Sequence, residues 1–433
     1  MGGHRQIQIR LVTLIFLVLL IIAGIITMTV MLTNKGKDKK ENDVMQNGIN
    51  EMQESNTVEE NTKADFELSF LKMENQKQNM IYSPLSIKYA LNMLKEGANG
   101  NTKTQIDNAL KNTSLTKYEN VKNVLSLANA IFIRENYSDI INEYYIEALE
   151  NKYNAEVKYD SFRSARNINN WISDKTFDQI NNVLTDEQVT NPDNRLTLIN
   201  ALAIDMEWKN MFDTSKTYGR AFKKADGKTM EATMMNKETS SGAAAYYKDD
   251  EVTALSMDLE TYNDIELEFV AIMPKNNLQE YIKTLKMDDL NKIINNLKPA
   301  SETKNGIKVA VPKFSFDYEL KLEEDLKKLG ITDAFSDIAD FSGISNVEDI
   351  HIGAAIHKAN IDFTEKGVKA AAVTVFMMET SGMIVEEDKP EEVIIDSPFI
   401  YLIRDKKTGE MWFVGTVYEP NSWDDDRASY RAR

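Results

Sequence analysis

Residues Thr364–Phe376 read TEKGVKAAAVTVF, a run of small and β-branched side chains that contains one glycine and no proline. Within Gly367–Ile384, the even positions up to 378 carry only Val, Ala, Thr, Phe or Met. Alternate side chains of a strand point to opposite faces, so this set would lie on one buried face, with Lys369 and Glu379 on the other. The next residues, Thr380–Gly382, are typical of an exposed loop. The pattern predicts a segment that can form a long strand and then runs into a loop.

Patterns on both sides of this segment predict further helices and strands. Ser83-Pro84 reads as a helix N-cap followed by proline at the first helical position, and apolar residues at helical spacing continue to Gly97. Thr197–Ile204 is short and almost wholly apolar, as in a strand covered on both faces, and its exception, Asn200, needs a buried partner. Other predicted strands are Ile265–Met273, Val309–Phe316, Phe399–Arg404 and Met411–Val417. Helices gather in the first half and strands in the second, which favours an α+β fold.

Composition excludes several classes of function. The chain has 433 residues, of which 42% are hydrophobic, so it can build a large core. Its 68 acidic and 51 basic residues give a formal net charge of -17, which disfavours nucleic-acid binding. It has no cysteine, which excludes disulfides and thiolate chemistry, and only three histidines, His4, His351 and His357. We expect His351 to be an ordinary surface or turn residue.

The two ends of the chain differ in composition from the middle. After an N-terminal flank, residues 1–10, an uncharged apolar stretch predicts a membrane-spanning signal-anchor at residues 11–32, with secretion after signal-peptide cleavage as the alternative. Residues 33–62 are polar and are expected to form a disordered linker. Residues 63–420 then form one body, and 421–433 are expected to be a solvated tail. The charges flanking the anchor leave its orientation open, although we expect the body on the extracellular face.

Short motifs for catalysis are weak. Ser301–Lys304 fits S-x-x-K and Lys407–Gly409 fits K-T-G, the pattern of penicillin-recognising enzymes, but Ser301 lies in a loop-like context with no S-D-N element between the two matches. The nucleophile elbow, the H-E-x-x-H zinc motif and the phosphate-binding loop are absent from the sequence. We therefore expect that the protein is not an enzyme.

Motifs spread along the body share the order of a known family. Thr364–Phe376 resembles the hinge of a serpin, in which a glutamate, a glycine and several alanines precede an exposed reactive loop. Leu198–Ala201 and Trp208 are similar to the strand and tryptophan at the opening of the serpin central sheet. Further similar motifs are Tyr82–Ser86, Met234-Met235, Val311–Phe314, Ala355–Ala359, Pro398-Phe399, Phe413, Gly415 and Pro420. The resemblance covers residues 64–420.

The resemblance implies an α+β serpin fold with three β-sheets, a large central sheet A, about nine helices and an exposed reactive-centre loop at residues 365–390. It implies a suicide substrate of serine endopeptidases: the protease cleaves the loop, is trapped as an acyl-enzyme, and the loop inserts into sheet A. The alternative is a non-inhibitory serpin that serves as a binding or carrier protein. We expect a monomer that binds a protease and, through its N-terminal helix, a membrane, with no cofactor or metal.

The resemblance also assigns residues to this mechanism. The cleaved bond is expected sixteen residues after Glu365, between Ser381 and Gly382, which suits elastase-like or subtilisin-like proteases, with cysteine proteases less favoured. Val368 replaces the family's usual threonine or serine, and Lys369 replaces its usual glutamate. Both replacements are tolerable because valine is apolar and lysine lies on the outward face. The hinge comprises Glu365, Gly367, Val368, Lys369, Ala370, Ala371 and Ala372.

Two further groups of residues match the family in positions that control opening of the central sheet. The shutter is a buried hydrogen-bonded cluster, and the breach is an ion pair beside a tryptophan at the top of the sheet. The shutter comprises Ser83, Ser86, Asn200 and His357, and the breach comprises Trp208, Lys313 and Glu365. None of these residues is expected to be catalytic.

Overall fold

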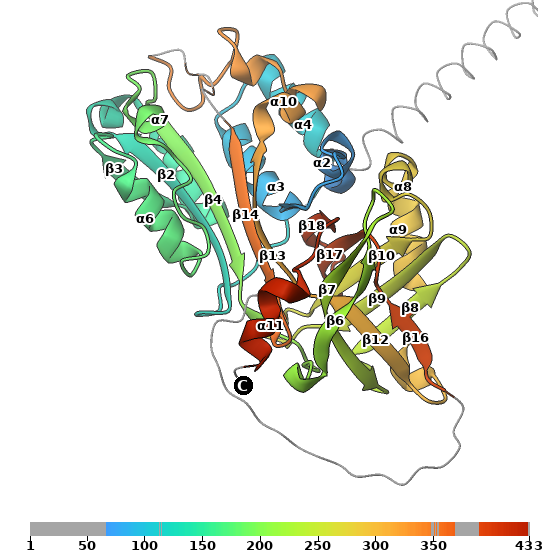
Figure 1. Cartoon of the computed structure of the whole chain (residues 1–433). Coiled ribbons are helices and arrows are strands. Elements are labelled where there is room, and N and C mark those ends of the chain that lie inside the picture. The colour runs from blue at the N-terminus through green and yellow to red at the C-terminus, as the bar shows by residue number, and fades with distance from the viewer. Residues whose placement is uncertain are drawn as a thin grey trace, which may run out of the picture. The chain divides into compact units, whose positions relative to one another are not determined.

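The computed structural model describes residues 66–111, 113, 115–347, 350, 352, 355–368 and 389–431, which lie in one compact unit that begins at Asp65 (Figure 1). The helices are α2 Phe66–Met73, α3 Pro84–Glu96, α4 Gly100–Leu110, α5 Glu143–Tyr153, α6 Arg166–Lys175, α7 Asp186–Thr190, α8 Leu278–Thr284, α9 Met287–Asn295, α10 Leu322–Lys328 and α11 Trp423–Arg431, with short 3₁₀ turns η1 Glu135–Ile140, η2 Thr214–Lys216, η3 Ala300–Glu302 and η4 Asp333–Phe335. The strands are β1 Met80–Tyr82, β2 Leu125–Arg134, β3 Glu156–Asp160, β4 Leu196–Ile204, β5 Met206–Glu207, β6 Thr217–Lys223, β7 Thr229–Thr239, β8 Ala244–Lys248, β9 Val252–Asp258, β10 Leu267–Pro274, β11 Lys298–Pro299, β12 Ile307–Pro312, β13 Phe314–Lys321, β14 Ile356–Phe363, β15 Gly367–Val368, β16 Glu391–Ile394, β17 Phe399–Asp405 and β18 Met411–Val417.

The largest sheet has seven strands in the order β1-β18-β17-β10-β9-β8-β11. Strands β10, β17 and β18 are buried along nearly their whole length, which explains why their sequences read as short apolar runs. A tight turn joins β17 to β18, and Gly409 adopts a φ of 76° there, a left-handed conformation that glycine adopts without strain. Buried side chains of this sheet make up much of the main hydrophobic core.

A second sheet has four strands in the order β16-β12-β7-β6. Residues 309–316 were expected to form one strand, but the structure divides them between β12 in this sheet and β13 in another. The division falls at Lys313, whose amide donates to the carbonyl of Thr233 in β7 at 2.9 Å, directly after Pro312 ends β12. A largely apolar run does not show that its two halves pair with different strands.

The central sheet consists of two ladders, β3-β2-β4 and β13-β14-β15-β5. Only Asp205 separates β4 from β5, so one continuous stretch of chain belongs to both ladders. Helix α6 lies on one face of β2 and β4, and α3 contacts β4 from the other side (Figure 1). The described strands therefore form four hydrogen-bonded sheets rather than the three expected, because the central sheet is parted between β4 and β14.

The C-terminal segment differs from its expectation. Residues 421–433 were expected to be a solvated tail, whereas Trp423–Arg431 form helix α11, which contacts β6 and β7 (Figure 1). Within the described part of the chain, no helix is long and apolar enough to cross a membrane. The predicted signal-anchor, residues 11–32, lies outside the described residues, so it stays a prediction.

Candidate functional site

The residues that precede the predicted reactive loop are held by one short segment of chain. The indole nitrogen of Trp208 donates to the carbonyl of Thr364 at 2.9 Å, and its backbone amide donates to the carbonyl of Lys366 at 2.8 Å. The amide of Phe212 donates to the carbonyl of Glu365, so three successive carbonyls have partners. The Trp208 ring is fully buried and packs edge-on against phenylalanines of β10 and β14. This packing fixes the point at which the chain leaves β14.

Two hinge residues already lie inside the central sheet. After a turn closed by the Thr364 amide and the Gly367 carbonyl at 3.0 Å, Gly367 and Val368 form β15. Strand β15 pairs antiparallel with β14 through Val368 and with β5 through both of its residues. A Cβ on Gly367 would lie 2.0 Å from the carbonyl oxygen of Met206, so this close approach requires glycine. The first two residues of an additional central strand are thus in place.

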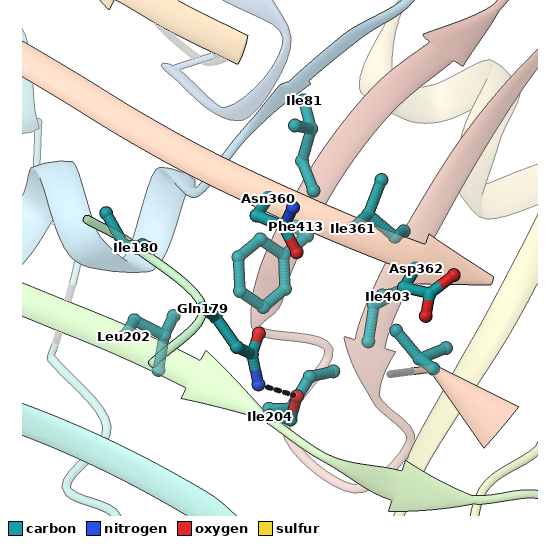
Figure 2. Close-up of a pocket in the computed structure, with 11 residues that line it drawn as sticks. Ile81, Gln179, Ile180, Leu202, Ile204, Asn360, Ile361, Asp362, Ile403 and Phe413 are labelled. Atoms are coloured by element: carbon teal, nitrogen blue, oxygen red, sulfur yellow. Dashed lines mark hydrogen bonds between the residues drawn. The ribbon is translucent and has the colours of Figure 1, made fainter. Parts of the chain in front are cut away.

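Beneath Val368 the sheet has a gap. Within the described residues, β4 is paired in the sheet only with β2, and β14 only with β13 and β15. Between them lies a small hollow with a volume of about 10 Å³, lined by Leu202 and Ile204 of β4, residues 360–362 of β14 and Val368 (Figure 2). The hollow continues the line of β15 between the two long strands.

The connection between α6 and α7 crosses this gap. The side-chain amide of Gln179 donates to the carbonyl of Ile204 at 3.1 Å, so it satisfies an acceptor at the edge of β4 (Figure 2). On the other side, the ammonium of Lys358 in β14 donates to the carbonyl of Asn181 at 3.0 Å. The connection therefore bonds to both strands that border the gap. Sequence reasoning did not single out these residues, whose partners are distant in the chain.

Lower in the sheet, the four shutter residues form one chain of hydrogen bonds. The N-cap side chain of Ser83 accepts from the Ser86 amide at 3.0 Å, and the Ser83 amide donates to Nε2 of His357 at 2.9 Å. The Ser86 hydroxyl donates to Oδ1 of Asn200. Because His357 belongs to β14 and Asn200 to β4, the start of α3 links the two strands across the gap.

A fifth residue extends this cluster. The Asn200 amide donates to Oδ1 of Asn129 at 2.7 Å, and the Asn129 amide donates to the carbonyl of Tyr153 at 2.7 Å. These two asparagines face each other in the β2–β4 ladder. Asn129 is the one asparagine in the largely apolar β2, as Asn200 is in β4, and that signal could have found it.

Burial lowers the pKa of His357 to about 4, because the apolar surroundings disfavour the imidazolium. The imidazole is therefore neutral at pH 7, and its Nε2 can accept the hydrogen bond from Ser83. Protonation would turn this acceptor into a donor that faces another donor. The hydrogen bonds of the shutter therefore require a neutral His357.

At the top of the sheet, the two charged breach residues lie close together with Trp208 beside them. Nζ of Lys313 is 3.8 Å from Oε2 of Glu365, whose side chain is 7% exposed. The Tyr430 hydroxyl donates to Oε1 of Glu365 at 2.5 Å, so a residue of α11 takes part in the breach. Sequence reasoning missed Tyr430 because it lies in the segment expected to be solvated.

The remaining site predictions lie outside the described residues. These are the hinge residues Lys369, Ala370, Ala371 and Ala372 and the reactive bond between Ser381 and Gly382. Among the residues that are described, no three His, Asp or Glu side chains are grouped so that they could hold a metal ion. The candidate site therefore consists of the strands β4, β14 and β15, the gap between β4 and β14, and the hydrogen bonds that link these two strands to neighbouring elements.

Comparison with known proteins places this architecture. A family model described as serpin (serine protease inhibitor) matches residues 59–420. Leukocyte elastase inhibitor of Bos taurus is 28% identical over 368 residues, which cover 80% of this chain and 94% of that protein. The structure of tengpin, a thermophilic serpin, in the native state is 30% identical with a TM-score of 0.68 and covers 83% of this chain and 93% of its own.

A third protein has the same fold under a different name. The structure of thyroxine-binding globulin in complex with thyroxine is 25% identical with a TM-score of 0.69 and covers 84% of this chain and 99% of its own. The predicted α+β serpin fold is confirmed by these matches. Because the family model spans most of the sequence, this chain belongs to the serpin family.

Proposed function

We propose that this serpin inhibits serine endopeptidases as a suicide substrate. The observation that carries the proposal is strand β15, which already pairs with β5 and β14 at the point where β4 and β14 are not paired with each other. A protease would cleave the loop beyond β15, and the segment after Val368 would continue β15 downward between β4 and β14 while the protease is still attached as an acyl-enzyme. The name of the bovine relative, leukocyte elastase inhibitor, agrees with this activity.

The plain prediction of no enzymatic role needs a correction. The family description is that of a serine protease inhibitor, and a suicide inhibitor takes part in the covalent chemistry of its target. The protease supplies the nucleophile and the proton transfers, and the serpin supplies the scissile bond and the change of fold. The protease therefore catalyses the cleavage, and the family description gives this chain the role of inhibitor.

The driving force is the completion of the central sheet. An interior strand adds two ladders of backbone hydrogen bonds, each bond worth about 0.5–1.5 kcal/mol net. About 15 inserted residues would therefore release on the order of 10 kcal/mol. The native state is held by a barrier rather than by equilibrium stability, and the bonds across the gap contribute to that barrier.

A non-inhibitory carrier is the second candidate, and the likeness to thyroxine-binding globulin favours it. The two functions differ in the step after cleavage of the loop. An inhibitor must insert its loop before water hydrolyses the acyl-enzyme, whereas a carrier needs no such speed.

We predict that the full chain forms a covalent complex with an elastase-like or subtilisin-like protease that survives denaturing electrophoresis. Trypsin-like and glutamyl proteases serve as matched comparisons, and mass spectrometry of the loop fragment should locate the cut between Ser381 and Gly382. Cleavage without a complex and without a gain in thermal stability would instead support the carrier. A single cut elsewhere in the loop would overturn the assigned bond alone.

Replacing Val368 with glutamate should turn the inhibitor into an ordinary substrate. Val368 is 3% exposed in β15, so a carboxylate in its place would favour expulsion of β15 from the sheet, and insertion would then have to bury the charge without a partner at a cost of several kcal/mol. We expect the stoichiometry of inhibition to rise at least tenfold, measured by titration of the protease. Val368→Thr, which keeps the β-branched shape, should remain inhibitory, and equal behaviour of the two variants would contradict the proposal.

Acid should weaken the native state through His357. In the unfolded chain His357 has a pKa near 6.5, whereas in the native structure its pKa is about 4. The free energy of unfolding that this difference contributes is therefore fully present above pH 6.5 and is lost as the pH falls towards 4. Between pH 7 and 5 the native chain should lose about 2 kcal/mol more than His357→Gln, measured by the midpoint of the first urea transition. His351→Gln is the control and should lose as much as the native sequence. Parallel pH curves for all three proteins would refute this role of His357.

We also propose that residues 11–32 anchor the chain in a membrane with the serpin body outside the cell, on the strength of their apolar sequence. The full chain should then sediment with membranes and stay there in alkaline carbonate, and a chain that starts at residue 63 should not. External protease should reach the body in intact cells. Recovery of a soluble protein that lacks residues 1–32 would support signal-peptide cleavage instead.

A further inference from the structure

The chain does not leave the body after its last strand. Asn421 lies between two sheets, where its backbone amide donates to the carbonyl of Lys313 at 2.9 Å and its carbonyl accepts from the Thr233 amide at 2.9 Å. Its side-chain oxygen accepts from the amide of Ser315 at 3.1 Å. Three hydrogen bonds therefore fix the start of the segment that leads into α11 at the junction of β12 and β13.

Helix α11 has a shaped contact with β6. A Cβ on Gly219 would lie 2.5 Å from the ring of Trp423, so the indole occupies space that only glycine leaves free. Tyr430 lies seven residues later on the same face of the helix, and its ring centroid is 5.5 Å from that of Trp423. The helix is thus docked by one aromatic residue and presents a second one to the breach.

Tyr430 bridges the two charges of the breach. Its hydroxyl accepts from Nζ of Lys313 at 3.1 Å and donates to Oε1 of Glu365 at 2.5 Å, and Nζ also stands 5.4 Å from the centre of its ring. The direct distance between Lys313 and Glu365 is 3.8 Å, beyond hydrogen-bond range. The Tyr430 hydroxyl therefore connects Lys313 to Glu365 by two hydrogen bonds, whereas the two charged groups make no hydrogen bond to each other.

The position of Glu365 gives this relay a mechanical consequence. Glu365 precedes Gly367 by two residues, inside the turn from which β15 starts. Any further movement of the chain into the gap pulls on this turn, because β15 is its continuation. A hydrogen bond to a charged group holds more strongly than a neutral one, so Tyr430 restrains the turn at a sensitive point.

We infer that α11 is a built-in clamp on the breach and that Tyr430 is a positioning residue that slows insertion of the reactive loop. This inference rests on the proposed function insofar as it assumes a loop that can insert. It assigns to the C-terminal segment the control of how long the inhibitor stays in its active native form. The clamp acts through Glu365 and contacts no protease.

The test measures insertion of the uncleaved loop without any protease. The full chain is held at a raised temperature below its unfolding midpoint, and the fraction that has become resistant to urea is measured over time. Tyr430→Phe keeps the ring and removes the hydroxyl, and we expect roughly tenfold faster conversion. Tyr418→Phe is the matched control, because among the described residues the buried Tyr418 hydroxyl has no hydrogen-bond partner. Its rate should equal that of the native sequence.

A double-mutant cycle separates a clamp from a general loss of stability. If Tyr430 acts through Glu365, then Tyr430→Phe should add little to the rate already raised by Glu365→Gln. Trp423→Ala, which undocks the helix, should accelerate conversion at least as much as Tyr430→Phe. An unchanged rate for Tyr430→Phe, or effects of Tyr430→Phe and Glu365→Gln that multiply, would overturn the clamp.

A second measurement distinguishes failure of the clamp from failure of the proposed function. Cleaving the loop of the native sequence should raise its thermal stability if insertion is possible at all. No rise would refute insertion itself, and the clamp with it. A rise, combined with equal conversion rates for Tyr430→Phe and the native sequence, would refute the clamp and leave the inhibitory mechanism standing.

Discussion

The gap between β4 and β14 is the constraint on which the rest of this structure depends. Two long interior strands border a space in which Gly367 and Val368 are the only described residues that pair as a strand. Backbone groups along such an edge need partners, and a sheet that lacks an interior strand leaves them to side chains and solvent. The Gln179 amide on the carbonyl of Ile204 is one such substitute. A strand that enters the gap must displace substitutes of this kind.

The contacts that hold the gap come from outside the sheet. Helix α3 links β14 to β4 from beneath, through Ser83 and Ser86, and the α6–α7 connection reaches both strands from the opposite face. Neither link joins the strands directly. Each must therefore rearrange when the strands separate further, so the barrier to the proposed insertion would be spread over elements that pack on the sheet rather than over the sheet itself.

The top of the gap is arranged differently, because there the additional strand has already begun. Trp208 and Phe212 donate hydrogen bonds to the carbonyls of residues 364–366, and Gly367 permits the close contact with β5. Lys313, Glu365 and Tyr430 add a polar layer above this point. Starting the strand lowers the cost of continuing it, since the first pairing fixes the register of the next residues. A restraint at the same place would then act directly on the rate of the proposed insertion.

Patterns within short stretches of sequence predicted the helix cap and the strands that are buried along nearly their whole length. The N-cap at Ser83 and the apolar runs of β17 and β18 were predicted within a residue of their observed bounds, because capping and burial act on neighbouring residues. The spread of matching motifs over the body also identified the serpin family, which the family model confirms. The roles of the shutter and hinge residues remain proposals, although the structure brings Ser83, Ser86, Asn200 and His357 into one cluster.

Only the tertiary structure decided which strands pair, where the sheet parts and what covers the breach. The run at 309–316 is largely apolar, yet the chain up to Lys313 bonds to β7 whereas Phe314 begins the pairing with β14, far away in the chain. The polar segment after Pro420 gave no sign of burial, because α11 docks through two aromatic rings rather than through an apolar stripe. Composition and periodicity report the average environment of a segment. The partner of a particular backbone group or hydroxyl is set by residues far away in the chain, and a pattern within one segment carries no trace of it.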